Sequence, residues 1–233
     1  MTATDTLLDR YVAVWNEPDA ATRRAAVAQL WTADGVHYTQ TRVFRGTDAL
    51  DARVTEAYEQ FVGGSGLLFR HRDNLVTHHD AGVFNWEMTP GKSRDVLAVG
   101  FDFVLLDEEG RLRVDYQFNE PPAPVAELDE LAGRLLALGR EGDEDLRRKQ
   151  AAALYSQDAR LVDDSAERDV LTALAATPQG EVRRLYGHAS TQHDAVRYAW
   201  ELFPADGGPA RTGVDFLIRG EDGLFTAHYR FTI

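Results

Sequence analysis

Residues 79–88 read HDAGVFNWEM and residues 193–202 read HDAVRYAWEL, so one chain carries nearly the same segment twice. His, Asp, Ala, Trp and Glu recur at matching places, 114 residues apart. In each copy a His-Asp pair precedes a run of strand-forming residues, a pattern typical of a β-strand that follows a tight turn. Such a match indicates either a duplicated active site or a duplicated domain, and the surrounding sequence decides between them.

The similarity extends far beyond this segment. Residues 7–34 match residues 131–158 as two helical hairpins, and GFDFVLLDEEGRL at 100–112 matches GVDFLIRGEDGLF at 213–225. The tetrapeptides DYQF at 115–118 and HYRF at 228–231 also correspond. The spacing falls from 124 to 113 along the chain, which places a deletion around the third helix of the second copy. A repeat of domain size that occurs twice indicates two related domains.

The order of predicted elements sets the fold class. In the first copy, apolar periodicity predicts two helices between Leu7 and Trp31, with Pro18 ending the first, and a third helix from Gly46 to about Phe61. Strands follow from Leu67 onward, separated by glycine-containing turns. Helices followed by an antiparallel meander predict an α+β fold. We expect one domain at 1–120, a proline-rich linker at 121–128, and a second, partly degenerate domain with a shortened third helix at 129–233.

Composition and charge exclude several classes of function. Hydrophobic residues make up 44% and charged residues 27% of the chain, a balance typical of a globular protein. The formal charge of −13 disfavours nucleic acid as a partner. The sequence has no cysteine and no apolar run long enough for a membrane span. We therefore expect a cytoplasmic protein with neither a nucleic-acid nor a membrane partner. Adjacent histidines at 78 and 79 point to opposite faces of a strand, so we expect no metal and no cofactor.

The combined motifs resemble the SnoaL-like branch of the NTF2-like superfamily. They comprise the WN and PD turn after the first helix, RG before the third, HHD with F and W in the strand, and G, DF, LD and GR near the end. The resemblance implies a cystatin-like cone in each domain, made of three helices and a curved, four-stranded antiparallel sheet around an apolar pocket. It also implies that the two sheets pair within the chain as a pseudo-dimer, with a homodimer as a further option. The same fold hosts isomerases, cyclases, hydrolases and binding proteins, so fold alone does not fix function.

Asp102 is the leading candidate for chemistry. It lies in the middle of an apolar strand, where burial disfavours its charged form. The resemblance implies more, because ketosteroid isomerases keep a protonated Asp at this position and a companion tyrosine that falls on Tyr11. Their general base falls on Thr39. In the second copy Asp215 matches Asp102 and Asp163 takes the position of the base, but Leu135 replaces Tyr11. Neither copy carries the complete isomerase set.

Alternation along the strands supplies the remaining candidates. In the last strand of the first copy, one face carries Asp115, Gln117 and Asn119, while Leu112, Val114, Tyr116 and Phe118 share the other. The resemblance implies that the first of these faces lines the cone. We expect catalytic roles for Asp102, Tyr11, Asp115 and His37, and substrate contacts from Phe84, Trp86, Gln117, Asn119 and Tyr38. The second domain contributes Asp163, Asp215 and His228 as candidates.

Three functions are compatible with these residues. The first is acid–base chemistry in the first cone, such as cyclisation, isomerisation or dehydration of a small apolar or polyketide-like molecule, with Asp102 and Tyr11 as oxyanion donors and Asp115 or His37 as the proton shuttle. The second is a ligand-binding or scaffold protein without catalysis. The third is epoxide hydrolysis, which requires an Arg–Asp pair that holds water, whereas the first copy has Asn85 and Glu87 on the corresponding strand.

Overall fold

The computed structural model describes residues 6–177 and 180–233. The chain forms two compact units, one up to Glu120 and one from Pro121. Each unit has helices before most of its strands and a single mixed sheet, as the predicted α+β class requires. Within the described residues, no helix is both long enough and apolar enough to cross a bilayer.

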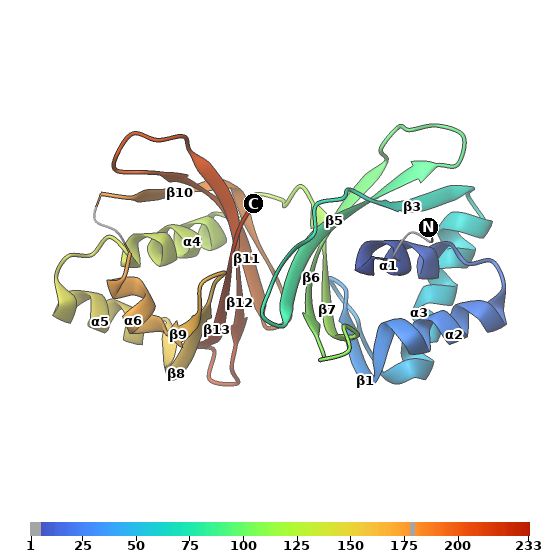
Figure 1. Cartoon of the computed structure of the whole chain (residues 1–233), viewed down its shortest axis with the longest axis horizontal. Coiled ribbons are helices and arrows are strands. Elements are labelled where there is room, and N and C mark those ends of the chain that lie inside the picture. Colours follow the sequence, from blue (N-terminus) through green and yellow to red (C-terminus); the bar gives the residue numbers. More distant parts are fainter. Residues whose placement is uncertain (1–5, 178–179) are drawn as a thin grey trace. The chain divides into compact units, whose positions relative to one another are not determined.

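Over the described residues 6–120, the first unit has three α-helices and seven strands. They are α1 (Leu7–Asn16), α2 (Ala20–Leu30), β1 (Trp31–Tyr38), β2 (Val43–Arg45), α3 (Gly46–Ala57), the π-helical η1 (Tyr58–Gly63), β3 (Leu67–His71), β4 (Val76–His78), β5 (Ala81–Pro90), β6 (Ala98–Leu106) and β7 (Leu112–Glu120). The strand order is β2-β1-β7-β6-β5-β3, with β4 also on β5. Every pair is antiparallel except β1 with β7, which is parallel. The sheet is therefore larger than the predicted four-stranded one, because β1 and β2 join it. The three helices gather on one face of this sheet (Figure 1).

Capping residues fix where the first helices begin. Thr6 accepts a hydrogen bond from the backbone of Asp9, and the Asp9 carboxylate accepts one from the backbone of Thr6, so the two form a capping box. Asp19 caps α2 after Pro18. Helix α1 then buries Tyr11 and Trp15 against the sheet side of the unit.

The second unit repeats this plan with a shorter third helix. It contains α4 (Ala126–Leu138), α5 (Glu144–Ala152), β8 (Tyr155–Val162), β9 (Glu167–Asp169), α6 (Val170–Ala175), β10 (Val182–Gln192), β11 (Ala195–Phe203), β12 (Arg211–Arg219) and β13 (Phe225–Thr232). The strand order is β10-β11-β12-β13-β8-β9. Helix α6 has 6 residues where α3 has 12. Helix α4 starts at Ala126, so it includes the last part of the linker predicted at 121–128.

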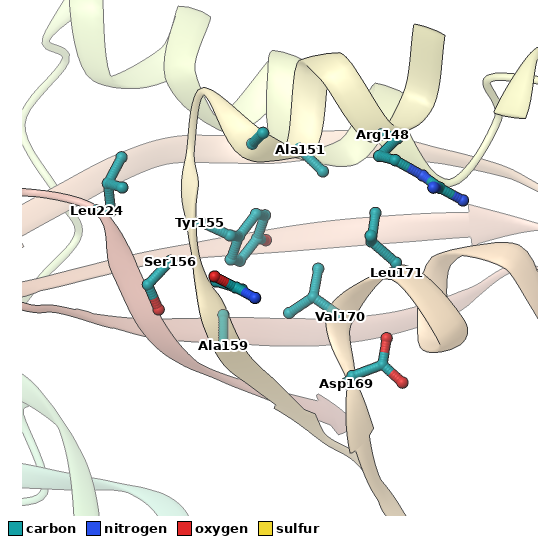
Figure 2. Close-up of a pocket in the computed structure, with 11 residues that line it drawn as sticks. Arg148, Ala151, Tyr155, Ser156, Ala159, Asp169, Val170, Leu171 and Leu224 are labelled. Carbon is teal, nitrogen blue, oxygen red and sulfur yellow. The ribbon is translucent and has the colours of Figure 1, made fainter. Parts of the chain in front are cut away.

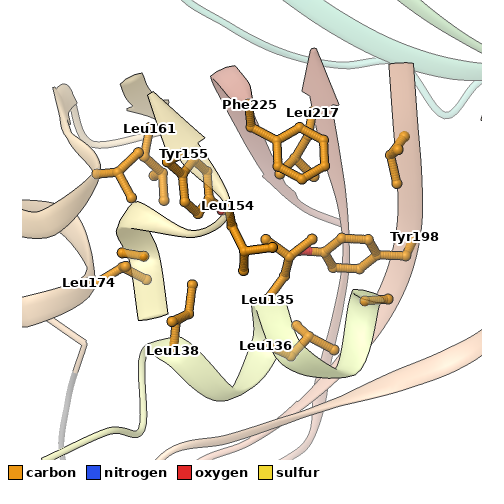
Figure 3. Packing of buried hydrophobic residues seen from close by; sticks show 14 of the residues in the cluster. Leu135, Leu136, Leu138, Leu154, Tyr155, Leu161, Leu174, Tyr198, Leu217 and Phe225 are labelled. Atoms are coloured by element: carbon orange, nitrogen blue, oxygen red, sulfur yellow. The ribbon is translucent and has the colours of Figure 1, made fainter. Parts of the chain in front are cut away.

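Apolar packing between α4, α5, α6 and the sheet forms the core of the second unit. Figure 3 shows Leu135 and Leu136 on α4 beside Tyr198, with Phe225 and Leu217 from the neighbouring strands. Burying each Leu or Phe side chain contributes about 1.5–3 kcal/mol relative to leaving it exposed. The hydrocarbon of Leu135 thus fills the place that Tyr11 has in the first unit.

The repeated HDA segment is a structural turn in both copies. His79 and His193 adopt left-handed backbone angles, with φ of 51° and 50°. The following carbonyl oxygens, of Asp80 and Asp194, accept hydrogen bonds from the backbone N–H of Leu106 (2.7 Å) and Arg219 (2.8 Å). The segment therefore fastens the start of one strand to the end of the next.

A bulge overturns one prediction from alternation. Leu112 was expected to share a face with Val114, but the register shifts between Leu105 and Leu106. Because a one-residue shift moves a side chain to the other face, Leu112 joins the helix-side core that includes Phe84 and Trp86.

Candidate active site

Tyr11 brings two carboxyl groups of the sheet together. Its hydroxyl oxygen lies 2.5 Å from Asp102 Oδ2 and 3.1 Å from Asp115 Oδ2. Asp102 lies on β6 and Asp115 on β7, while Tyr11 reaches them from α1. Trp86 on β5 donates its indole N–H to Asp102 Oδ1 over 3.2 Å. Three predicted catalytic residues and one predicted substrate contact thus meet in one buried cluster.

His37 completes the set of four predicted catalytic residues. Its Nδ1 lies 2.9 Å from Asp115 Oδ2, and His37 and Asp115 are paired across β1 and β7. Among the described residues no hydrogen-bond partner is present for His37 Nε2 or for Asp115 Oδ1, although both atoms are buried. With Nδ1 donating its proton to Asp115, the ring is held as the tautomer whose Nε2 bears a free lone pair.

The Tyr11 hydroxyl links the two carboxyl groups. Its oxygen is within hydrogen-bond distance of both, so its single proton can be donated to either carboxyl oxygen. Burial, with the charges of Asp102 and Asp115, raises the pKa of Tyr11 well above its ordinary value, so the phenol remains neutral. The cluster is a short chain of proton donors and acceptors.

Aromatic rings enclose the cluster. The ring of Phe84 meets Tyr11 edge-on with centroids 5.0 Å apart, and those of Trp15 and Trp31 lie 5.9 and 6.1 Å from it. Asp102, Asp115 and His37 are each 0% exposed. The indole N–H groups of Trp15 and Trp31 are buried and make no hydrogen bond within the described residues. Buried polar atoms of this kind are usually satisfied by water or by a ligand.

Arg53 was not anticipated from the sequence. Its guanidinium carbon lies 5.3 Å from the centre of the Trp15 ring and 5.9 Å from that of Phe44. Burial, followed by the nearby charge of Arg42, lowers the pKa of Arg53, while the charge of Glu56 opposes that shift. A signal was present in the sequence: residues 50, 54 and 57 form the buried stripe of α3, and position 53 adjoins it.

Other predicted contacts are separated from the cluster. Tyr38 stacks on Tyr116 with centroids 4.3 Å apart and follows His37 in the strand, so it lies on the opposite face. Asn119 is exposed and donates to Gln40. Gln117 is half-buried and paired across the sheet with Asp102. Tyr38 and Asn119 are therefore poor candidates for substrate contact, and Gln117 remains one.

The second unit holds a fully buried ionic cluster around Asp215. Arg230 donates two hydrogen bonds to its carboxylate, of 2.9 and 2.7 Å, and Trp200 and Tyr198 donate one each, of 2.8 and 3.0 Å. His228 Nε2 lies 2.8 Å from Asp215 Oδ2. Burial alone would raise the pKa of Asp215, but Arg230 and His228 hold it well below its ordinary value. This carboxylate is ionised and saturated with donors, which makes it a structural ion pair rather than an acid–base group.

Asp163, at the position that the resemblance gave to the general base, lies in a turn. Its carboxylate accepts hydrogen bonds from the backbone N–H of Ser165 and Ala166, both 3.0 Å, and pairs with Arg168. These contacts hold the turn between β8 and β9. Thr39, at the matching place in the first unit, bonds Arg42 in the turn between β1 and β2. Thr39 and Asp163 thus both stabilise the turn between the first two strands of their unit.

The described residues contain no group of three or more His, Asp or Glu side chains arranged to hold a metal ion. Tyr11, Asp102, Asp115 and His37 are all side chains that can donate or accept protons.

Solved structures similar to this chain each cover about half of it. No family model matches the chain, and no curated protein matches it. A SnoaL-like family structure from Agrobacterium tumefaciens, named as a suspected isomerase, is 28% identical over 52% of this chain and 99% of its own, with a TM-score of 0.45. An NTF2-like protein of unknown function from an Exiguobacterium species is 18% identical over 50% of this chain and 100% of its own, with a TM-score of 0.41. A suspected polyketide cyclase from Sinorhizobium meliloti is 9% identical over 50% and 95%, with a TM-score of 0.38.

Proposed function

For this chain of two NTF2-like units, we propose that the first unit binds a small apolar carbonyl compound and moves a proton on it, in an isomerisation, cyclisation or dehydration. The observation that carries the proposal is the position of the Tyr11 hydroxyl between two buried carboxyl groups, one of which also contacts His37. Pairs of titratable groups with different environments are typical of acid–base sites. The solved structures that this chain resembles include a suspected isomerase and a suspected polyketide cyclase. These names fit the proposed class of reaction but specify no substrate.

The acid is the Tyr11–Asp102 pair. We place the proton that this acid supplies on Asp102, because its carboxyl group is fully buried and lies 2.5 Å from the Tyr11 oxygen. Asp102 then donates to the Tyr11 oxygen, and Tyr11 presents its own proton to the oxygen of a bound carbonyl. A hydrogen bond that strengthens as the carbonyl oxygen gains charge stabilises the transition state more than the bound substrate.

The base is His37, held by Asp115. His37 Nε2 takes a proton from the carbon next to the carbonyl while Tyr11 delivers a proton to the oxygen, and an enol results. Tyr11 recovers its proton from Asp102. The imidazolium beside the Asp115 carboxylate then gives its proton to another carbon or to a departing hydroxyl, while the enol O–H returns its proton through Tyr11 to Asp102, which restores the carbonyl group and the starting state of the cluster. Asp115 positions the ring and stabilises its charged form, as the carboxylate does in other His–Asp pairs.

A specific observation favours a second candidate, a ligand-binding or scaffold unit without catalysis. Asp102, Asp115 and His37 are fully buried beneath rings of Trp15 and Phe84. A polar cluster that never meets substrate would serve only to orient the elements of the core. Epoxide hydrolysis gains no support, because Asn85 bonds Gly100 and Asn74, and Glu87 pairs with Arg72.

Proton exchange at carbon distinguishes the two candidates. The purified full chain is incubated in D2O with a panel of small cyclic β,γ-unsaturated ketones and β-keto esters, and deuterium incorporation is followed by NMR. We expect exchange with at least one probe, a loss of about 100-fold in His37→Gln, and a loss of about 10-fold or more in Tyr11→Phe. His188→Gln, at a half-exposed histidine of the second unit, is the matched control. Binding of a probe without exchange would support the non-catalytic candidate instead.

A further inference from the structure

A cavity of about 360 Å³ opens in the second unit between α5, the start of β8 and the start of α6. Figure 2 shows Ala151, Tyr155, Ala159 and Val170 around it, with Leu171 and Arg148 at one side. The volume falls within the range of small-molecule sites, and most lining side chains are apolar. Leu171 keeps 37% of its surface exposed here.

The short third helix explains why this cavity exists. In the first unit α3 packs on α2. Trp31 begins β1, which is parallel to β7, and the smaller Tyr155 takes the same position in the second unit, at the start of β8, which is parallel to β13. Helix α6 is half as long as α3. The deletion noted in the sequence therefore removed part of a lid and left apolar side chains without cover.

The matching arginines of the two units differ in their partners. Arg24 on α2 bonds two carboxylates of α3, Asp48 at 2.5 Å and Asp51 at 2.9 Å. The counterpart of Arg24, 124 residues later, is Arg148, which lines the cavity. At the same spacing the two carboxylates are replaced by Thr172 and Ala175, both exposed.

Arg148 is consequently available to an external anion. It pairs with Glu144, one turn earlier on α5, in an exposed ion pair 2.7 Å apart. Such a pair within a helix contributes only about 0.3–0.5 kcal/mol, so an anion in the cavity can replace it. Asp169 also lines the cavity, but its Oδ1 accepts the backbone N–H of Thr172 and caps α6. In Figure 2 Leu171 lies between Arg148 and Asp169.

We propose that this cavity is a second ligand site, which binds a small carboxylic acid with an apolar body. The hydrocarbon occupies the space among Ala151, Val170 and Leu224, and the carboxylate pairs with Arg148 in the place that Asp48 and Asp51 take in the first unit. The site is separate from the proposed active site and does not depend on it.

Octanoate is the probe, and octanol is its neutral counterpart. Titration calorimetry on the full chain should show octanoate binding at least 10-fold tighter than octanol. Arg148→Gln should weaken octanoate at least 10-fold, and Arg24→Gln, the matched arginine of the first unit, should leave its affinity unchanged. The double variant Thr172→Asp/Ala175→Asp restores the missing carboxylates at exposed positions and should also weaken octanoate at least 10-fold.

Amide chemical shifts locate the binding. Octanoate should perturb residues of α5, α6 and β8, and circular dichroism should show that each variant keeps the fold. The proposal is overturned if octanoate does not bind below its micelle concentration, if it binds no better than octanol, if Arg148→Gln binds it as tightly as the wild type does, or if the shifts lie in the first unit.

Discussion

The hydroxyl of Tyr198 donates a hydrogen bond of 3.0 Å to the carboxylate of Asp215. In the first unit the corresponding carboxyl group, on Asp102, accepts its hydrogen bond from the hydroxyl of Tyr11, which lies on helix α1. Phe84 stands at the strand position of Tyr198, and Leu135 stands at the helix position of Tyr11. The two units therefore keep the phenol–carboxyl contact but supply the phenol from different elements.

The histidine of the cluster likewise comes from different strands in the two units. In the first unit His37 on β1 faces Asp115 on β7, and in the second Leu161 on β8 faces His228 on β13. Both units thus combine tyrosine, aspartate and histidine beneath their helices. They differ in charge, because Arg230 occupies in the second unit the position that Gln117 has in the first.

The exchange of phenols can be reproduced by substitution. Tyr11→Leu removes the donor shared by Asp102 and Asp115, and it should lower the free energy of unfolding by about 2–5 kcal/mol. Adding Phe84→Tyr, which copies the arrangement of the second unit, should recover about 1 kcal/mol or more of that loss. Urea unfolding of the wild type, both single variants and the double variant measures the coupling. A double variant no more stable than Tyr11→Leu would show that a tyrosine at position 84 cannot replace the hydrogen bond of Tyr11.

Arg230 should be essential to the second unit. Arg230→Gln leaves the ionised carboxylate of Asp215 buried without its cation, and we expect a loss of about 3–5 kcal/mol in the free energy of unfolding. Adding Asp215→Asn removes the uncompensated charge and should restore part of the stability. Differential scanning calorimetry of the two variants tests this, and an Arg230→Gln protein as stable as the wild type would refute it.

Protonation of His228 should destabilise the second unit at mildly acidic pH. Burial lowers the pKa of His228, although Asp215 opposes the shift, so the ring stays neutral to a lower pH in the folded unit than in the unfolded chain. Its Nε2 lies 2.8 Å from Asp215 Oδ2, and its Nδ1 lies 2.8 Å from the Tyr155 hydroxyl oxygen. The unfolded chain binds this proton near pH 6.5 and the folded chain only at lower pH. The contribution of this residue is therefore complete above pH 6.5 and declines as the pH falls through that value, by up to about 1.4 kcal/mol per pH unit.

The measurement is a pair of stability curves between pH 5 and pH 8. His228→Gln keeps a donor and an acceptor at this place but does not titrate, so its stability should fall less than that of the wild type below pH 6.5. Leu97→Gln, at an exposed and uncharged position, should follow the wild-type curve. Equal slopes for the wild type and His228→Gln would show that His228 is not the group responsible.

The sequence predicted the architecture because duplication gave each pattern twice. Helical periodicity and the HDA repeat determine the order of elements. Alternation grouped Asp115 with Gln117 and Asn119, and the resemblance placed that face inside the cone, where Asp115 lies near Asp102. The approach of Tyr11 came from the resemblance, since no local pattern reports a contact between residues 91 positions apart.

Other features depend on packing that a local pattern does not encode. Leu112 changed face because of a bulge, and Tyr38 lies away from the cluster although it adjoins His37. Asp163 looked like a base by position, but its carboxylate is used by a turn. Tyr198 carries the phenol of the second unit, and alignment with Phe84 gave no reason to look for it there. When the second copy supplies an equivalent side chain from a different element, alignment of the two copies misses it and the three-dimensional structure is needed to find it.

Two glycines of the repeat should tolerate no side chain. A Cβ on Gly100 would lie 2.1 Å from the ring of Trp86, and one on Gly213 would lie 2.1 Å from the ring of Trp200. Each indole crosses the neighbouring strand at its glycine in order to donate to Asp102 or Asp215. Gly100→Ala or Gly213→Ala must displace the tryptophan and break this hydrogen bond, with an expected loss of about 2–4 kcal/mol in the free energy of unfolding.

Gly133→Ala is the matched control for these variants. Gly133 is exposed in α4, and a Cβ there meets no atom within 4 Å. Because alanine favours the helix, this variant should gain about 0.5–1 kcal/mol. Calorimetric unfolding of the three alanine variants compares them directly. The recurrence of tryptophan and glycine in both copies follows from this contact, and a Gly100→Ala or Gly213→Ala protein as stable as the wild type would disprove it.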